Sequence, residues 1–122
     1  MNPYLKYKEQ SVMTMTPGEM VVRLFEEAIK QLTIARSAIN NHKIETANSS
    51  LLKSQNIIRH LRSTLNMQYE ISNNLAMLYD FFINQIIQSN IKKDTQPIDD
   101  IIPMLTELKD SFAQAEKLAR ID

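Results

Sequence analysis

Four long stretches of the sequence repeat apolar residues at spacings of three and four positions. Because an α-helix turns once every 3.6 residues, this spacing puts the apolar residues on one face of a helix. The stretches cover about residues 17–40, 44–65, 70–91 and 98–120. Each is therefore predicted to form an amphipathic helix that buries one side, and the fold class is all-α.

The same spacings indicate which residues face the core. In the second stretch Ser54 is the one polar residue on the core-facing side, and its hydroxyl is expected to bond the backbone carbonyl four residues back. In the last three stretches the expected core residues are Ile44, Leu51, Ile58 and Leu65, then Ile71, Leu75, Leu78, Phe82 and Ile86, and finally Ile98, Ile101, Leu105, Leu108, Phe112, Ala115 and Ala119.

The connections between the first three stretches are only a few residues long, whereas residues 90–97 are polar and predict a longer loop. Short connections force consecutive helices to run antiparallel. We therefore predict an antiparallel up-down four-helix bundle that forms a single domain over residues 16–122. Pro103 falls inside the last stretch, and we expect it either to kink that helix or to mark its true start.

Composition excludes several functional classes. Gly18 is the only glycine, so a glycine-rich phosphate-binding loop is impossible, and the absence of cysteine excludes disulfides, thiolate zinc sites and cysteine nucleophiles. Lys plus Arg and Asp plus Glu number 14 each, which argues against nucleic-acid binding. No apolar run approaches the roughly 20 residues of a membrane span, and residues 1–20 lack a signal-peptide core. We expect a soluble intracellular domain with no membrane insertion.

Residues 1–15 differ from the rest of the chain. Asn2-Pro3 cannot lie inside a helix, and Tyr4, Tyr7 and Val12 follow no helical spacing. We predict an extended N-terminal strap that lies over the bundle, with Tyr7 in an apolar slot. The alternative is a disordered terminus, against which the aromatic residues argue.

A strong helix-start signal follows the strap. Thr16-Pro17-Gly18-Glu19 puts a hydroxyl at the N-cap, proline at the first helical position and glutamate at the third. We expect the Thr16 oxygen to accept the Glu19 amide and the Glu19 side chain to bond back to the Thr16 amide.

The sequence offers little chemistry for catalysis, metal or cofactor binding. A di-iron bundle needs Glu-x-x-His pairs, but Ile39 and Ile57 stand three residues before His42 and His60. We therefore predict no metal site, no cofactor and no enzyme activity. His60, between two arginines, leaves open the alternative of a His-dependent phosphotransfer bundle.

Apolar residues that fall beside the seams are the main functional signal. Leu52 and Ile57 flank the seam of the second stretch, and the third is widened by Met77, Ile83 and Ile87. Wide stripes also arise where one helix packs on two neighbours, and single exposed apolar residues are common. Together these five residues predict an apolar groove that receives an amphipathic partner, for which methionine is well suited.

Several motifs, in order along the chain, resemble the FliS family of flagellar secretion chaperones. The first is Tyr7-x4-Val12-x-Thr14-x-Thr16-Pro17-x-Glu19, and similar motifs occur at residues 53–65, 74–80 and 89–94. The chain departs from the family pattern at three positions, with Phe112 in place of tryptophan, Ser54 in place of alanine, and an unusual Pro103.

The resemblance implies a bacterial cytoplasmic protein that binds the disordered C-terminal segment of flagellin. Such chaperones prevent premature flagellin polymerisation and deliver flagellin to the flagellar type III export gate. The free protein is expected to be a monomer or a weak homodimer. A four-helix adaptor or regulator with another partner is the alternative. The family motif assigns the strap and its hinge to partner binding through Tyr7, Val12, Thr14, Thr16 and Pro17, and we add Tyr4 from the same strap.

Overall fold

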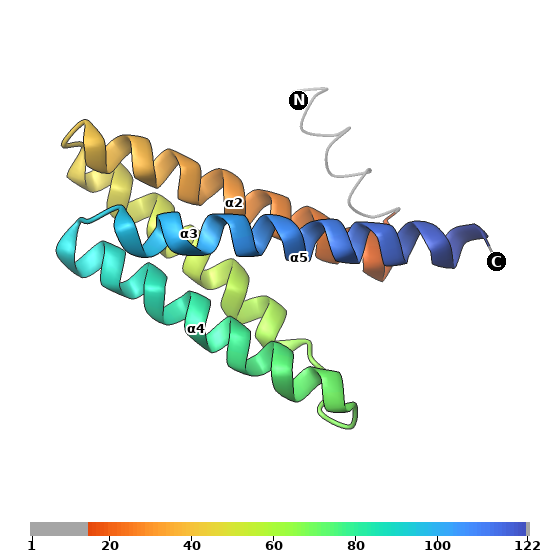
Figure 1. Cartoon of the computed structure of the whole chain (residues 1–122). Coiled ribbons are helices and arrows are strands. Elements are labelled where there is room, and N and C mark those ends of the chain that lie inside the picture. Colours follow the sequence, from red (N-terminus) through yellow and green to blue (C-terminus); the bar gives the residue numbers. More distant parts are fainter. Residues whose placement is uncertain (1–14, 122) are drawn as a thin grey trace, which may run out of the picture.

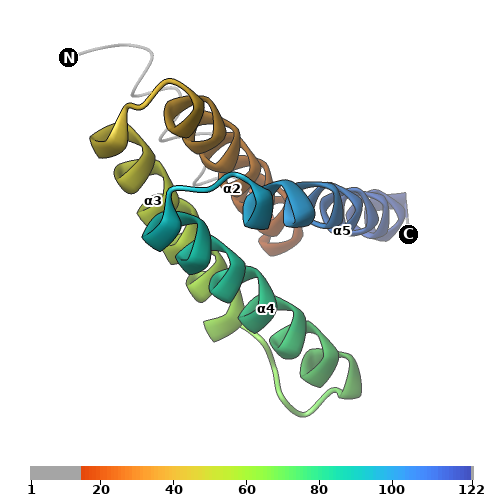
Figure 2. The ribbon, with the colours of Figure 1, turned by 60° about the vertical axis from the view of Figure 1, so that its left-hand side comes forward.

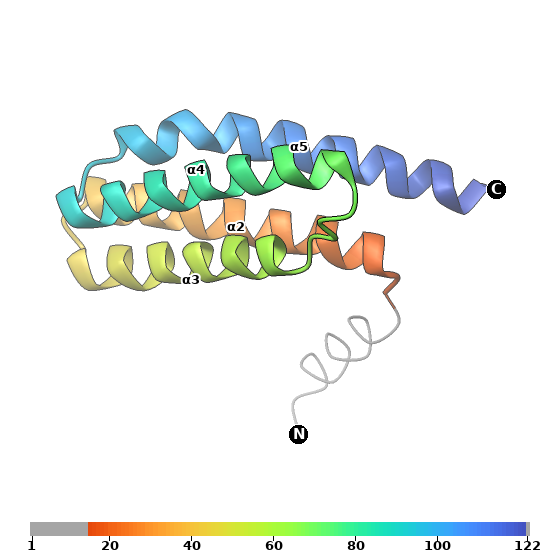
Figure 3. The ribbon, with the colours of Figure 1, turned by 90° about the horizontal axis from the view of Figure 1, so that it is seen from below.

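The computed structural model describes residues 15–121, and almost all of them lie in four helices. These are α2 (Pro17–Asn40), α3 (Ile44–Ser63), α4 (Glu70–Lys92) and α5 (Gln96–Ile121). Consecutive helices run in opposite directions (Figures 1 and 3). The predicted all-α, up-down architecture is confirmed.

The helices follow one another around the bundle in chain order. Helix α2 packs on α3 and α5, and α4 packs on the same two neighbours from the other side. The α2–α3 contact is the most extensive and the α4–α5 contact the least. Helix α5 is therefore supported mainly by α2.

Small buried side chains allow α2 and α3 to approach closely. Helix α2 buries Ala28 and Ala35, and α3 buries Ala47, Ser50 and Ser54. The buried Ser54 hydroxyl donates to the Leu51 carbonyl oxygen at 2.9 Å, three residues back, so the predicted bond to the fourth residue back is wrong. The bond satisfies a hydroxyl that would otherwise be costly to bury.

The core contains large side chains from all four helices. Fully burying such a side chain contributes about 1.5–3 kcal/mol each, which makes this set the main source of stability. The largest fully buried apolar side chains are Phe25, Leu32, Leu51, Ile58, Phe82, Ile86, Ile98, Ile101 and Leu105.

The connection between α4 and α5 is shorter than predicted. Only residues 93–95 separate the two helices, so the expected polar loop over residues 90–97 is wrong at both ends. Lys93 ends α4 in the left-handed region with a φ of 50°, and the buried Ser89 hydroxyl accepts the Ile98 amide at 3.2 Å. Helix α5 begins before Pro103 and continues through it, so Pro103 does not mark the helix start.

The two ends of the bundle differ. At the closed end, which contains the α2–α3 and α4–α5 connections, the predicted seam residues Ile98 and Ile101 are fully buried. At the open end, where α4 begins and α5 finishes, Ile71 is 64% exposed, and Ala115 and Ala119 are also exposed. Figures 1 and 2 show these parts of α4 and α5 diverging. The prediction that all three are covered is therefore wrong for this conformation. Ile44, at the start of α3, is likewise 50% exposed rather than buried.

Candidate partner-binding surfaces

The structure confirms the predicted helix start, while most of the strap lies outside its described part. Tyr4, Tyr7, Val12 and Thr14 fall outside residues 15–121. The two hinge residues lie at the start of α2, where Thr16 caps the helix and Pro17 is its first residue.

A shallow groove lies between α3 and α4. Two polar contacts join the helices along it, one between Asn48 and Asn90 and one between Arg62 and Asp80. Near the closed end, the Asn90 side-chain amide donates to the Asn48 side-chain oxygen at 2.9 Å. A hollow of about 220 Å³ lies beside this contact and is lined partly by Ile87 and Ile91. Leu52 is 43% exposed and lies one helical turn from Asn48. Ile87 thus lines the hollow, and Leu52 lies exposed beside it on α3.

Arg62 and Asp80 connect α3 and α4 farther along the groove. The Arg62 Nε donates to Asp80 Oδ1 and its Nη2 to Oδ2 at 3.0 Å, a bidentate geometry. The hydrogen bond from Arg62 lowers the pKa of the Asp80 carboxyl below its ordinary value, and the Arg62 charge acts in the same direction. Both side chains are about half exposed, so this pair fixes orientation more than it adds stability.

The outer face of α4 carries exposed apolar residues in helical register. Met77 and Ile91 are each 72% exposed, and Phe81 is 40% exposed. Their spacings of four and ten place them on one side of the helix, away from the core. Met77 was predicted for partner binding, whereas Phe81 and Ile91 were missed, although the seven-residue repeat Met77-x6-Asn84-x6-Ile91 would have indicated this face.

The other two predicted groove residues occupy different surroundings. Ile57 is half-buried and packs against the core from a face of α3 different from that of Leu52. Ile83 is only 7% exposed and belongs to the core. Its burial keeps Ile83 away from any exposed surface.

Aromatic side chains lie beneath the open end. Phe112 stacks on Phe25 with ring centroids 5.5 Å apart, and Phe25 lies 6.2 Å from Tyr79. Phe112, at the position of the family tryptophan, thus connects α5 to the core of α2. Tyr79 is only 2% exposed and belongs to the core. Burial raises the pKa of Tyr79 from its ordinary 10.0 to about 12.

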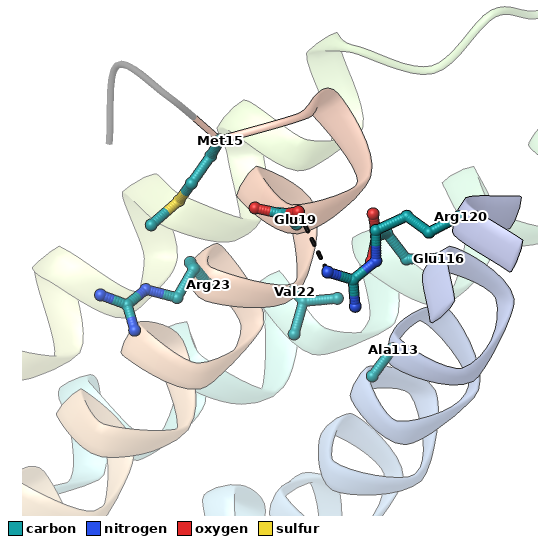
Figure 4. Close-up of a pocket in the computed structure, with 7 residues that line it drawn as sticks. All are labelled: Met15, Glu19, Val22, Arg23, Ala113, Glu116 and Arg120. Atoms are coloured by element: carbon teal, nitrogen blue, oxygen red, sulfur yellow. Dashed lines mark ion pairs between the residues drawn. The ribbon is translucent and has the colours of Figure 1, made fainter. Parts of the chain in front are cut away.

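Beyond Phe112, polar side chains connect the end of α5 to the start of α2. Thr16 Oγ1 accepts the Glu19 amide at 3.1 Å and donates to Glu116 Oε1, also at 3.1 Å. Arg120 forms ion pairs with Glu116 at 3.0 Å and with Glu19 at 3.5 Å. Figure 4 shows Glu19, Glu116 and Arg120 around a pocket of about 300 Å³ that Met15 also lines. The Glu19 carboxylate faces Arg120, so its predicted bond to the Thr16 amide is not formed.

Histidine and acidic side chains are spread over the described helices. His60 is exposed on α3. Within residues 15–121, no three His, Asp or Glu side chains gather in a way that could hold a metal ion. None of the four described helices is long and apolar enough to cross a membrane.

Comparison with known proteins decides the family. A sequence model described as flagellar protein FliS matches residues 1–119 of the chain. A flagellar secretion chaperone FliS from Bacillus subtilis (strain 168) is 37% identical over 121 residues, which cover 99% of this chain and 91% of the relative. The chain belongs to the FliS family.

Further relatives agree with this assignment. A flagellar secretion chaperone FliS from Vibrio cholerae serotype O1 is 38% identical over 101 residues, covering 81% of this chain and 74% of the relative. A crystal structure described as a flagellar chaperone from bacteria superposes with a TM-score of 0.78 over 93% of this chain and 94% of the other, at 23% identity. That likeness shows that the FliS-family chain shares the other protein's fold.

Membership in the FliS family makes this protein a flagellar secretion chaperone and not an enzyme. The family-like motif at residues 74–80 gains a structural meaning, because Tyr79 and Asp80 connect α4 to the core and to α3.

Proposed function

We propose that this FliS-family chaperone binds the disordered C-terminal segment of flagellin along its apolar surfaces. The bound segment is thereby kept from premature polymerisation and delivered to the flagellar type III export apparatus. The protein acts in the bacterial cytosol, and when free it is a monomer or a weak homodimer. The family carries this proposal, since its relatives are flagellar secretion chaperones.

The single structural observation that supports it is the uncovered seam at the open end. Ile71 and Ala115 occupy the core-facing register of their helices, yet both are exposed. An amphipathic helix that docks here would cover them through anchors three, four and seven residues apart. Leu52, Ile87 and Met77 extend the proposed contact along the α3–α4 groove and the outer face of α4.

A partner that folds on binding suits a chaperone that must release it. The ordering of a disordered segment costs conformational entropy, which offsets part of the free energy of the apolar contacts. The complex is therefore expected to be specific but reversible. The exposed methionine Met77 adds adaptability, because an unbranched thioether fits several shapes.

The strap forms a separate part of the proposed binding site. Residues 1–14 precede Met15, which lines the pocket between α2 and α5. We propose that the strap lies over the bundle with Tyr7 in an apolar slot and either stays or yields when flagellin binds. Affinity and association rate would be measured for Tyr7→Ala and for a chain lacking residues 1–11. If both parameters equal those of the unaltered chain for both variants, the strap has no binding role.

The main experiment compares two exposed isoleucines at the starts of two helices. Ile71→Gln changes the open end, and Ile44→Gln changes the closed end, where the side chain is 50% exposed. The exposed part of an isoleucine contributes about 1 kcal/mol when covered, or roughly a fivefold change in Kd. We expect calorimetry with the C-terminal segment of the cognate flagellin to show this loss for Ile71→Gln alone.

Three outcomes would decide against the proposal or a part of it. No binding by the unaltered chain at micromolar protein would reject flagellin as the partner and favour a different adaptor role. Equal losses from both variants would remove the open end from the site. His60-dependent transfer of phosphate from a phosphorylated response regulator, absent in His60→Gln, would favour phosphotransfer, against which the non-enzymatic family already argues.

A further inference from the structure

The only glycine of the chain lies where a helix would favour another residue. Gly18 is the second residue of α2. Glycine within a helix is less favourable than alanine because it loses more backbone freedom on folding. Among the described residues no glycine has a positive φ, so backbone conformation does not require one here. Another reason must lie in its surroundings.

That reason is the close approach of α5. A Cβ atom added at Gly18 would lie 2.7 Å from the Glu116 Cγ, closer than real Cβ contacts allow. The same Cβ would lie 3.5 Å from the Glu116 Cβ, which is ordinary van der Waals contact. Because residue 18 has no side chain, the Glu116 side chain can pass close to the α2 backbone.

Glu116 uses this space to reach the polar groups at the start of α2. Its side chain is only 11% exposed, and its two oxygens bond Thr16 and Arg120. Arg120 also pairs with Glu19. The Thr16 hydroxyl donates its one hydrogen to Glu116 and accepts the Glu19 amide. We call Thr16, Gly18, Glu19, Glu116 and Arg120 the α2–α5 clasp.

The clasp lies beside the last turns of α5, where most apolar side chains are exposed. Phe112 is the last α5 side chain that packs against the core. After it, Ala115, Leu118 and Ala119 are all exposed, Leu118 by 58%. Ala113 is half-buried beside Val22, so this small apolar contact and the polar contacts to α2 together hold these last turns in place.

We propose that the α2–α5 clasp positions the end of α5 against α2 and thereby keeps the open end preformed for its partner. This inference rests on the proposed function. In this inference the clasp residues act through α5, so Thr16, which the family motif assigns to partner binding, contributes by positioning α5 rather than by contact. A preformed surface binds more tightly than one that is populated only part of the time, because apparent Kd rises in inverse proportion to the populated fraction.

The first test changes the donor of the clasp without removing the helix cap. Thr16→Asp keeps an N-cap acceptor for the Glu19 amide but cannot donate to Glu116 and places a like charge beside it. Thr16→Ser retains both bonds and is the matched control. In the full-length protein, we expect Thr16→Asp to speed hydrogen exchange of the amides of residues 114–120 and to weaken binding of the flagellin C-terminal segment about three- to tenfold. The serine variant should match the unaltered chain in both.

The second test uses the steric basis of the clasp. Gly18→Ala should weaken binding in the unaltered chain, because the new methyl displaces Glu116. In a Glu116→Ala background the same change should have no further effect, because only the Glu116 Cβ then faces residue 18. This non-additivity is specific to the contact and would not follow from a general loss of helix stability.

The outcomes separate the inference from the proposed function. Unchanged exchange in Thr16→Asp would overturn the clasp itself, and faster exchange with unchanged affinity would overturn its positioning role. A Gly18→Ala effect that persists unaltered without the Glu116 side chain would also overturn it. Failure of the proposed function is recognised differently, by an unaltered chain that does not bind the segment at all, which would remove the positioning role as well.

Discussion

The closed and open ends of the bundle continue the same apolar patterns but cover them differently. At the closed end, Ile98 and Ile101 are fully buried, and the chain reverses within a few residues at His42 and Lys93. At the open end, Ile71 and Leu118 are 64% and 58% exposed. Helical periodicity therefore says which side of a helix is apolar, but it does not say whether a neighbouring helix covers that side.

The difference agrees with the proposed docking of a flagellin segment at the open end. The closed end supplies stability through buried side chains and satisfied helix ends. The open end leaves apolar residues uncovered, which lowers the stability of the free protein but provides surface for binding. The closed end thus contributes more to the stability of the fold, and the open end has the more exposed apolar surface.

The largest expected effect comes from truncating matched isoleucines at the two ends. Ile101→Ala should lower the free energy of unfolding by about 3 kcal/mol, because it leaves a cavity in the closed end. Ile71→Ala should lower it by less than about 0.5 kcal/mol, since most of that side chain already contacts solvent. Urea unfolding followed by circular dichroism measures both. Equal losses would mean that the open end is covered in solution.

A smaller effect is expected from pH, through the tyrosine beneath the open end. Because burial raises the pKa of Tyr79 to about 12, the folded state keeps a neutral phenol at a pH where the unfolded state, with a pKa of 10.0, has lost its proton. This contribution to stability is full below pH 10 and is lost as the pH rises from 10 to 12. The Tyr79→Phe variant has no phenol to titrate, so it should not show this loss of stability.

The measurement is the free energy of unfolding of both proteins at several pH values. Between about pH 9 and about pH 11.5, the unaltered protein should lose roughly 2 kcal/mol relative to Tyr79→Phe. Parallel curves would show that water reaches Tyr79, and the open end would then extend deeper into the bundle than the structure indicates.

The smallest expected effect concerns the backbone of the closed end. His42 has a φ of 58°, which costs a residue with a side chain about 1 kcal/mol. His42→Gly removes this cost but adds freedom to the unfolded chain, so a net gain of about 0.5 kcal/mol is expected. Thermal unfolding should show a slightly higher Tm. A lower Tm would mean that the His42 side chain itself stabilises this turn.

Local signals in the sequence predicted much of the fold. Thr16 and Pro17 begin α2 as their cap pattern indicates, and the seam residues Phe82, Ile86 and Leu105 are buried. Such features depend on residues close in the chain. The short α4–α5 connection was missed because Lys93 adopts a left-handed conformation that its residue type does not favour.

The features that the sequence could not provide depend on residues far apart in the chain. Glu19 pairs with Arg120 rather than with the Thr16 amide because α5 lies beside the start of α2. The exposure of Ile71 and Ala115 depends on the divergence of α4 and α5, which no helical repeat encodes. Gly18 was a usable signal, since a helix's first turn has no conformational need of glycine and a glycine there indicates a close neighbour.

Hydrogen exchange with and without the C-terminal segment of flagellin tests the central claim most directly. The amides of residues 71–78 and 108–119, at the open end, should exchange more slowly in the complex. Those of residues 39–47 and 93–101, at the closed end, should exchange at the same rate in both states. Slower exchange confined to the closed end, at saturating flagellin segment, would contradict the assignment of the open end as the docking surface.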